Sequence, residues 1–299
     1  MCGIVGLYLK DEQLSDHIGE MFADMLICMS ERGPDSAGFA IYGDETPAGT
    51  IKVTLRQTSD RVDWAALRGD LDREFGGESA LTTNATYAVV QVSAEEPAVR
   101  GYLKRQHPSV RVMSVGRRIE ILKEVGNPAS IVERFNVRKM RGSHVIGHTR
   151  MATESAVTTE GSHPFSTGMD LCLVHNGSLS NYNRLRRRLR RYGIEFRTEN
   201  DSEVAAGYLM WRLREGDTLK ESLEAALRDL DGFYTFAIGT ADGFAVLRDP
   251  IACKPAVMAE NDDYVAIASE YRSLAVLPGI QDAKIWEPEP AIVYAWGRN

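Results

Sequence analysis

The sequence predicts an α+β fold, on three observations. Apolar residues recur at helical spacing in several segments, of which residues 18–29 are the clearest. Short runs rich in β-branched residues, such as residues 4–9, indicate buried strands. Residues 234–240 and 244–248 flank the turn residues Asp242 and Gly243, a pattern typical of a hairpin and therefore of antiparallel pairing. Helices and antiparallel strands in one chain predict an α+β fold.

Composition limits the function classes. The chain has 299 residues, 43% apolar and 26% charged, which is ordinary for a globular protein of one large or two modest domains. A formal charge of −7 disfavours nucleic acid as the main partner. We find no apolar run of membrane-spanning length and no signal-peptide pattern, so we expect a cytoplasmic protein. The four cysteines are widely spaced and include no CxxC pair, so we expect no metal site, no disulfide framework and no cofactor.

The expected elements alternate along the chain. Alternating or continuous apolar runs bounded by turn residues predict strands at 4–9, 39–42, 85–92, 110–115, 118–125, 143–153, 171–177, 234–240, 244–248, 256–259, 264–268 and 292–295. Helical periodicity predicts helices at 18–29, 62–75, 97–106, 129–135, 183–191, 201–213 and 219–230, and Ser269-Glu270 is expected to open a short one. The helix expected at 183–191 is strongly basic, which we interpret as a solvated face or a partner contact. Asp201 or Ser202 is expected near the start of the helix that follows it.

Residues 43–142 contain no recognisable chemical motif. Their apolar periodicity is retained, so they are expected to form an inserted α+β layer within a domain that spans residues 1–299, and not a linker. A structural elaboration is the preferred interpretation, and a partner contact is the alternative.

The N-terminal residues Met1-Cys2-Gly3 suggest a nucleophile. Removal of Met1 would leave Cys2 with both a thiol and a free α-amine. Such an amine has a pKa of roughly 7.7–8.0, so at neutral pH it can accept the thiol proton. Gly3 and Gly6 would let the backbone approach a ligand closely. The alternative is a chain that merely begins with Met-Cys and continues into a strand.

Two further strands end in polar residues. Arg150, beside Thr149 and Thr153, has the geometry to bind a carboxylate with two parallel hydrogen bonds, although a strand-end salt bridge is the ordinary alternative. Asn176-Gly177 is usually a hairpin turn. The same pair also offers a side-chain amide and an unobstructed backbone N–H, two donors that suit an oxyanion.

The motifs occur together in a fixed order. They are Cys2-Gly-Ile-Val-Gly6, Arg32-Gly-Pro-Asp35, Gly147-His-Thr-Arg150, His175-Asn-Gly177, Asn200-Asp-Ser-Glu203, Arg248-Asp-Pro250 with Lys254-Pro255, and Ala268-Ser-Glu270. This ordered set resembles the class II glutamine amidotransferase domain, an N-terminal-nucleophile hydrolase, over residues 1–43 and about 143–299. The resemblance implies an αββα sandwich, in which two antiparallel sheets lie between layers of helices.

The resemblance also assigns roles. It implies Cys2 as the nucleophile, Asn176 and Gly177 as the oxyanion hole, Arg150 with Thr153 beside it for the α-carboxylate of glutamine, Asp201 for the α-ammonium, and Arg32 and Asp35 as residues that order the adjacent loop. These roles suit free glutamine, a zwitterion with an amide tail, which needs one cation, one anion and a nucleophile. Met151 departs from the aromatic residue that many family members carry there, which leaves the closure of the glutamine pocket open.

A synthase partner is expected on the same ground. The chain carries no pyrophosphate loop of the asparagine synthetase kind, no sugar-isomerase pattern and no phosphoribosyl-pyrophosphate loop, so the ammonia acceptor would lie on another polypeptide in a hetero-oligomer. The length and the insertion are similar to separate amidotransferase subunits related to glutamate synthase, among them the small subunit of N-methylglutamate synthase.

Two alternatives remain to this active subunit. One is a catalytically idle subunit with an assembly or regulatory role, favoured if Met1 is retained. The other is an N-terminal-cysteine amidase for a different amide, which Arg150 and Asp201 disfavour because together they match an α-amino acid.

Overall fold

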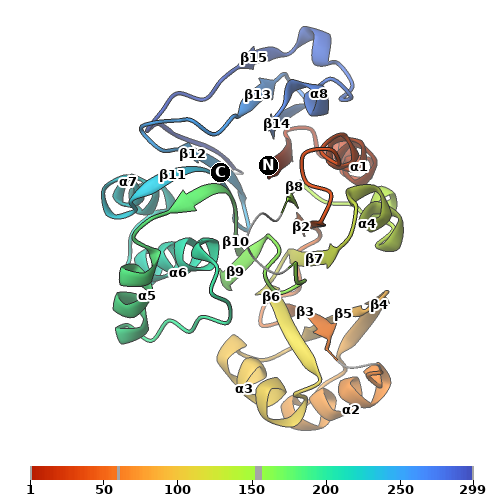
Figure 1. The fold of residues 1–299 in the computed structure, drawn as a ribbon. Coiled ribbons are helices and arrows are strands. Elements are labelled where there is room, and N and C mark those ends of the chain that lie inside the picture. Colours follow the sequence, from red (N-terminus) through yellow and green to blue (C-terminus); the bar gives the residue numbers. More distant parts are fainter. Residues whose placement is uncertain (1, 59–60, 152–156, 298–299) are drawn as a thin grey trace.

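Two antiparallel sheets packed face to face form the centre of the molecule (Figure 1). The computed structural model describes residues 2–58, 61–151 and 157–297. The seven-stranded sheet has the order β15 (Lys284–Trp286), β13 (Val257–Glu260), β14 (Tyr264–Ala268), β1 (Gly3–Leu9), β8 (His144–Arg150), β2 (Ser36–Tyr42) and β7 (Ile119–Val125). The five-stranded sheet has the order β16 (Val293–Gly297), β12 (Gly243–Arg248), β11 (Gly232–Gly239), β10 (Leu171–Leu179) and β9 (Phe165–Gly168).

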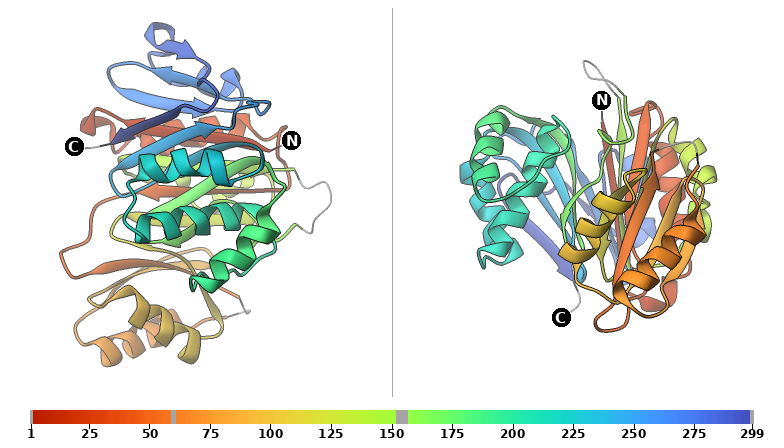
Figure 2. Two further views of the ribbon diagram at one scale, coloured as in Figure 1. Left: turned by 90° about the vertical axis from the view of Figure 1, so that its left-hand side faces the viewer. Right: turned by 90° about the horizontal axis from the view of Figure 1, so that it is seen from below.

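Helices cover the outer face of each sheet (Figures 1 and 2). α1 (Ile18–Cys28), α4 (Pro128–Arg134) and α8 (Tyr271–Leu274) lie on the seven-stranded sheet, and α5 (Tyr182–Arg191), α6 (Asp201–Arg214) and α7 (Leu219–Asp229) lie on the five-stranded sheet. Three 3₁₀ turns occur at Glu12–Leu14, Val137–Lys139 and Ile280–Asp282. The predicted α+β sandwich with helices on both outer faces is therefore confirmed.

Strand β1 is central, and its sequence explains its burial. All seven residues are buried. Val5, Leu7 and Leu9 contact the helix layer, whereas Ile4 and Tyr8 face the opposite sheet. A strand buried on both faces reads as a continuous apolar run, because side chains alternate between the two faces. This packing fixes the N-terminal end of β1 within the sandwich.

A third sheet forms a separate layer, drawn below the sandwich in Figure 1. Its order is β4 (Ala80–Asn84), β5 (Tyr87–Val92), β3 (Ile51–Gln57) and β6 (Val110–Gly116), and α2 (Trp64–Phe75) and α3 (Glu96–Gln106) cover one face. Within the expected 43–142 region, only residues 51–116 form this layer. β7 pairs with β2 in the main sheet, and α4 joins the core beneath α1.

Some predicted elements differ from the structure. Strands β3, β4, β9 and β15 were not predicted: three of them have only three to five residues, and β4 is largely exposed and polar, so apolar alternation is weak there. In β3, by contrast, apolar residues do alternate: Ile51, Val53 and Leu55 lie in the core of the third sheet. This alternation is a strand pattern that can be read from the sequence. The strand expected at 143–153 ends at Arg150 among the described residues. The expectation that Asp201 or Ser202 lies near the start of α6 is confirmed, since the helix begins at Asp201 and Asn200 caps it. Among the described residues, no helix is long and apolar enough to cross a membrane.

Candidate active site

Three distant segments converge on the first residues of β1, just after the partly exposed Cys2. The backbone carbonyl of Cys2 accepts hydrogen bonds from Arg32 Nε at 2.9 Å and from Asn176 Nδ2 at 3.2 Å. Two residues on, Ile4 N–H donates to Ser269 Oγ at 2.9 Å, and Ser269 N–H donates back to the Ile4 carbonyl. The first residues of β1 are thus held in place by contacts that span the sequence.

The Arg32-Gly-Pro-Asp35 loop packs against both Cys2 and the end of β8. Arg32 pairs with Glu270 at 2.7 Å, and this hydrogen bond is the main reason that the pKa of Glu270 lies below its ordinary value. Gly33 lies so close to β8 that a Cβ would be 2.4 Å from the carbonyl carbon of Thr149. Asp35 N–H donates to the Arg150 carbonyl at 3.0 Å. The loop thus connects the position of Cys2 with that of Arg150.

Asn176 and Gly177 lie inside β10 and are not a hairpin turn. Asn176 pairs with Thr235 and Gly177 pairs with Tyr234 of β11. Strand alternation puts Asn176 on the same face of β10 as Cys172 and Val174, toward the seven-stranded sheet. This is why its side-chain amide reaches Cys2.

The N–H of Gly177 points away from β11. Tyr234 uses its own N–H and C=O for Asp249, with both distances 3.0 Å, so its pairing with Gly177 is of the non-hydrogen-bonded type. On the other side of β10, β9 pairs only as far as Leu173 among the described residues. Gly177 has φ 151°, and a Cβ would lie 2.0 Å from the Phe233 carbonyl oxygen, so glycine is required here. The strand therefore brings the Asn176 amide to Cys2 and leaves the neighbouring N–H of Gly177 unbonded to β11.

Asp201 begins α6 and is tied to the strand that carries Asn176. Its Oδ2 accepts from Leu179 N–H at 2.8 Å, and its Oδ1 lies 3.9 Å from His175 Nδ1. The side chain keeps 21% of its surface exposed. A carboxylate at a helix N-terminus is favoured by the helix dipole. Its Oδ1 also accepts from Ser202 Oγ at 3.3 Å, and the partly exposed carboxylate is suited to bind a cation.

Arg150 and the start of α6 meet at one carbonyl. Gly161 O accepts from Arg150 Nη1 at 3.3 Å and from Asn200 Nδ2 at 3.2 Å. Gly161 belongs to residues 158–164, which we call the support loop. The α-carboxylate and α-ammonium of glutamine share one carbon, so a glutamine site needs its cation and anion close together. Thr153, predicted beside Arg150, lies outside the described residues.

Buried titratable groups lie behind the site. The rings of His148 and His163 are 4.0 Å apart, and those of His163 and His175 are 6.5 Å apart. Burial lowers the pKa of His148 to about 3, that of His163 well below its ordinary value, and that of His175 in the same direction. All three imidazoles are therefore neutral at neutral pH, and burial also lowers the pKa of Lys123 to about 7.

Several supporting residues were not assigned a role from the sequence. The sequence places Ser269 and Glu270 in a motif and at the start of a short helix, and the structure shows that they also hold Ile4 and Arg32. Arg186 was grouped with the solvated arginines of α5, but it is buried, pairs with Glu199 and donates to the Asn200 carbonyl at 3.2 Å. Lys123 interrupts an inward-facing series after Ile119 and Ile121, and that break in the pattern was the available signal.

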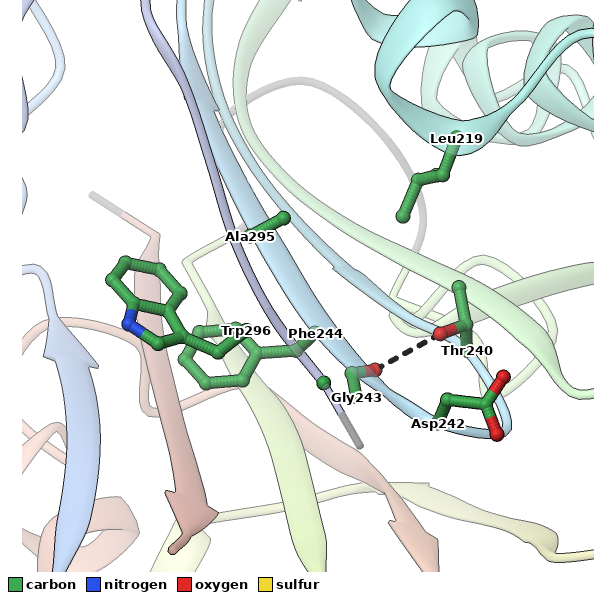
Figure 3. A pocket seen from close by; sticks show the side chains of 8 residues that line it. Leu219, Thr240, Asp242, Gly243, Phe244, Ala295 and Trp296 are labelled. Atoms are coloured by element: carbon green, nitrogen blue, oxygen red, sulfur yellow. Dashed lines mark hydrogen bonds between the residues drawn. The ribbon is translucent and has the colours of Figure 1, made fainter. Parts of the chain in front are cut away.

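A pocket lies at the other end of β11 from the pairing of Asn176 with Thr235 (Figure 3). Thr240, Asp242, Phe244 and Trp296 are among the residues that line it. Its lining combines one carboxylate with aromatic surface and contains neither a cysteine nor a basic residue. These residue types do not match glutamine, so the site described above does not include this pocket.

This fold is that of the class II glutamine amidotransferases, and the chain belongs to this family. Residues 148–276 match the family model described as a glutamine amidotransferase domain. The chain is 58% identical to the glutamine amidotransferase-like protein GlxB of Rhizobium meliloti (strain 1021), over 99% of this chain and 98% of that protein.

Two other relatives agree with this assignment. A putative glutamine amidotransferase of Methanothermobacter thermautotrophicus is 32% identical over 98% of this chain and 99% of that protein. The solved glutamine phosphoribosylpyrophosphate amidotransferase from B. subtilis superposes with a TM-score of 0.63 at 20% identity, over 99% of this chain and 47% of that one. The chain thus spans about half the length of that structure, which supports the fold.

Proposed function

We propose that this chain hydrolyses the side-chain amide of glutamine through a thioester on Cys2. The observation that carries the proposal is the contact of Asn176 with the Cys2 carbonyl, because it brings a potential oxyanion donor to the N-terminal thiol. One hydrogen of the Asn176 amide serves this carbonyl, which leaves the second for a substrate oxygen. Gly177 N–H would supply the other oxyanion donor.

The proposed reaction has two halves. The α-amine accepts the Cys2 thiol proton, and Sγ attacks the carboxamide carbon to give an oxyanion held by Asn176 and Gly177. The C–N bond then breaks, the amine returns its proton to the departing nitrogen, and ammonia leaves a γ-glutamyl thioester. In the second half, the amine takes a proton from water, which attacks the thioester. Glutamate leaves, and the thiol regains its proton.

The proposed site holds glutamine at its α-carbon by opposite charges. Arg150 would bind the α-carboxylate and Asp201 the α-ammonium, and the two are linked through Gly161 and Asn200. Arg32 and Asp35 would order the loop between Cys2 and Arg150. No cofactor is assigned to this reaction.

Substituting Arg150 by lysine tests the substrate assignment. Lysine keeps the charge but loses the two-pronged geometry. We therefore expect kcat/KM for glutamine to fall by a factor that corresponds to a loss of about 2–3 kcal/mol in transition-state stabilisation. The measurement is glutamate release at several glutamine concentrations, with Arg141→Lys, an exposed arginine, as the control. An unchanged kcat/KM for Arg150→Lys would show that the α-carboxylate is held by another group.

We further propose that the ammonia is consumed by a separate glutamate-synthase-like subunit, with N-methylglutamate synthase as the particular candidate. Two comparisons support this proposal. This chain covers 98% of the relative matched at 58% identity, whereas it covers only 47% of the phosphoribosylpyrophosphate amidotransferase chain. Five arginines of α5 are exposed: Arg184, Arg187, Arg188, Arg190 and Arg191. They and the inserted layer at 51–116 are the two candidate partner surfaces, and the inserted layer is preferred.

Mass spectrometry of proteins that copurify with the full chain from its own cells tests the partner. We expect a glutamate-synthase-like subunit, and faster glutamine hydrolysis in the complex, because a partner that prefers the closed site shifts the chain toward it. Arg68→Glu with Arg105→Glu, on α2 and α3, should weaken copurification, while Arg187→Glu with Arg190→Glu on α5 should not. A monomer with full glutaminase activity and no copurifying subunit would contradict this proposal.

A further inference from the structure

Lys123 is a fully buried amine surrounded by backbone carbonyls of the support loop. Its Nζ donates to Ser162 O at 2.5 Å, to Pro164 O at 3.1 Å and to Glu160 O at 3.2 Å, and it lies 4.7 Å from the centroid of the Phe165 ring. A protonated amine has three hydrogens, one for each carbonyl. Lysine is almost never fully buried unless such partners are present. The amine therefore fixes alternate residues of one loop to β7.

The neighbours of Lys123 are shaped to admit this loop. Gly38 of β2 is paired with Lys123, and a Cβ at Gly38 would lie 2.3 Å from the His163 carbonyl oxygen and from Lys123 Cβ. Glycine at this position thus lets the loop and the lysine pass. Tyr87 of the inserted layer donates its hydroxyl to the Lys123 carbonyl at 2.6 Å and so fixes the lysine backbone from the other side.

The support loop in turn contacts both polar parts of the proposed glutamine site. Gly161 O, between two of the carbonyls that Lys123 holds, accepts from Arg150 and from Asn200, the cap of the helix that begins with Asp201. The inserted layer touches the same region twice. Arg56 pairs with Glu160 at 2.7 Å, and the Val112 carbonyl accepts from Arg197 at 2.8 Å, three residues before Asn200.

We propose that Lys123 is a positioning residue for glutamine binding: it fixes the support loop so that Gly161 holds Arg150 and the start of α6 at the spacing of the α-carboxylate and α-ammonium. The inserted layer reinforces the same loop through Arg56. This inference rests on the proposed function for its substrate and on the contacts of Lys123 and Gly161 for its geometry. It also gives the inserted layer a task within the chain itself.

The depressed pKa of Lys123 limits how many of these carbonyls the amine can hold near neutral pH. Burial lowers it to about 7, so a neutral amine with only two hydrogens is accessible near neutral pH, and one of the three carbonyls would then lose its donor. Among the charged neighbours, Glu203 and Glu160 raise this pKa and Arg56 and Arg197 lower it, while the rings of His148 and His163 are neutral.

The test compares Lys123→Met with Lys52→Met in the full chain. Lys52 is a matched control, since it is also buried at the contact between the inserted layer and the main sheet and bonds Glu120 at 3.0 Å and two backbone carbonyls, but it does not contact the support loop. In the Cys2→Ser background, glutamine binding is measured by calorimetry. We expect Lys123→Met to raise the Kd by at least about tenfold, as loss of a charged hydrogen-bond donor does, and Lys52→Met to leave it unchanged.

Three further readouts separate positioning from general destabilisation. With Cys2 intact, Lys123→Met should raise KM and change kcat little, and Lys123→Arg should recover part of the loss. Hydrogen exchange of amides in residues 158–164 should speed up in Lys123→Met and not in Lys52→Met. If Lys123→Met does not fold, Arg56→Met decides, and we expect a smaller rise of the Kd.

Each remaining result overturns one of the two proposals. An unchanged Kd in Lys123→Met, or equal effects in both lysine variants, would refute the positioning role, as would an unchanged Kd in Arg56→Met when Lys123→Met is unfolded. A chain that binds no glutamine at all, yet whose support loop exchanges faster only in Lys123→Met, would contradict the proposed function and leave the structural role of Lys123 in place.

Discussion

Replacing Cys2 by serine is expected to lower the rate of glutamine hydrolysis by at least about 10³-fold, as removal of a catalytic nucleophile does in other hydrolases. A serine hydroxyl holds its proton far more tightly than a thiol, so an adjacent amine cannot activate it to the same extent. The contacts of Arg32 and Asn176 reach the Cys2 carbonyl and not its side chain, so the substitution should leave the site folded. The measurement is glutamate release under saturating glutamine.

The other cysteines provide the control for this substitution. Cys253 is exposed and lies in a loop after β12, so Cys253→Ser should retain full activity. Cys172 is buried beside the Tyr42 hydroxyl, and burial raises its thiol pKa to about 12, which makes it a poor nucleophile. Cys2→Ser with activity close to that of the unaltered chain would exclude a Cys2 thioester.

Replacing Asn176 by alanine is expected to lower kcat by about 10²–10³, the loss found when one oxyanion-hole donor is removed. KM should change less, because the amide interacts with charge that develops after glutamine has bound. The variant also removes one of the two hydrogen bonds to the Cys2 carbonyl, whereas Arg32 keeps the other. Separate determination of kcat and KM distinguishes this result from a loss of binding.

An asparagine remote from Cys2 serves as the comparison for that variant. Asn181 caps the start of α5, where its side chain donates to the Asp229 carbonyl and accepts from Asp231 N–H, so Asn181→Ala should leave kcat unchanged. A kcat for Asn176→Ala within threefold of the unaltered chain would rule out Asn176 as an oxyanion donor.

The parts of the candidate site that lie in short motifs could be proposed from the sequence. Cys2, Asn176 and Arg150 each stand at or near the end of an apolar run, where a strand delivers a polar group to an edge, so their positions could be inferred locally. The structure brings Asn176 against Cys2, 174 positions away, and Arg32 against Cys2, 30 positions away. The order of the motifs indicated this convergence through a resemblance, and not through local periodicity.

The support of the site could not be predicted in the same way. The contacts of Lys123 are with backbone carbonyls, which carry no side-chain signature in the sequence. The single ion pair of Arg32 with Glu270 joins residues 238 positions apart. The bounds of the inserted layer could not be predicted either, because they depend on which strands pair. β6 and β7 look alike in sequence, but β6 pairs with β3 in the third sheet and β7 pairs with β2 in the main sheet.

Labelling with 6-diazo-5-oxo-norleucine, followed by peptide mass spectrometry, tests the central claim most directly, because this glutamine analogue alkylates the nucleophile that attacks the amide. We expect one adduct, on Cys2, in a chain whose N-terminal residue is Cys2, and we expect glutamine to slow the labelling. An adduct on Cys28, Cys172 or Cys253, or full glutamine hydrolysis by a chain that retains Met1, would contradict it.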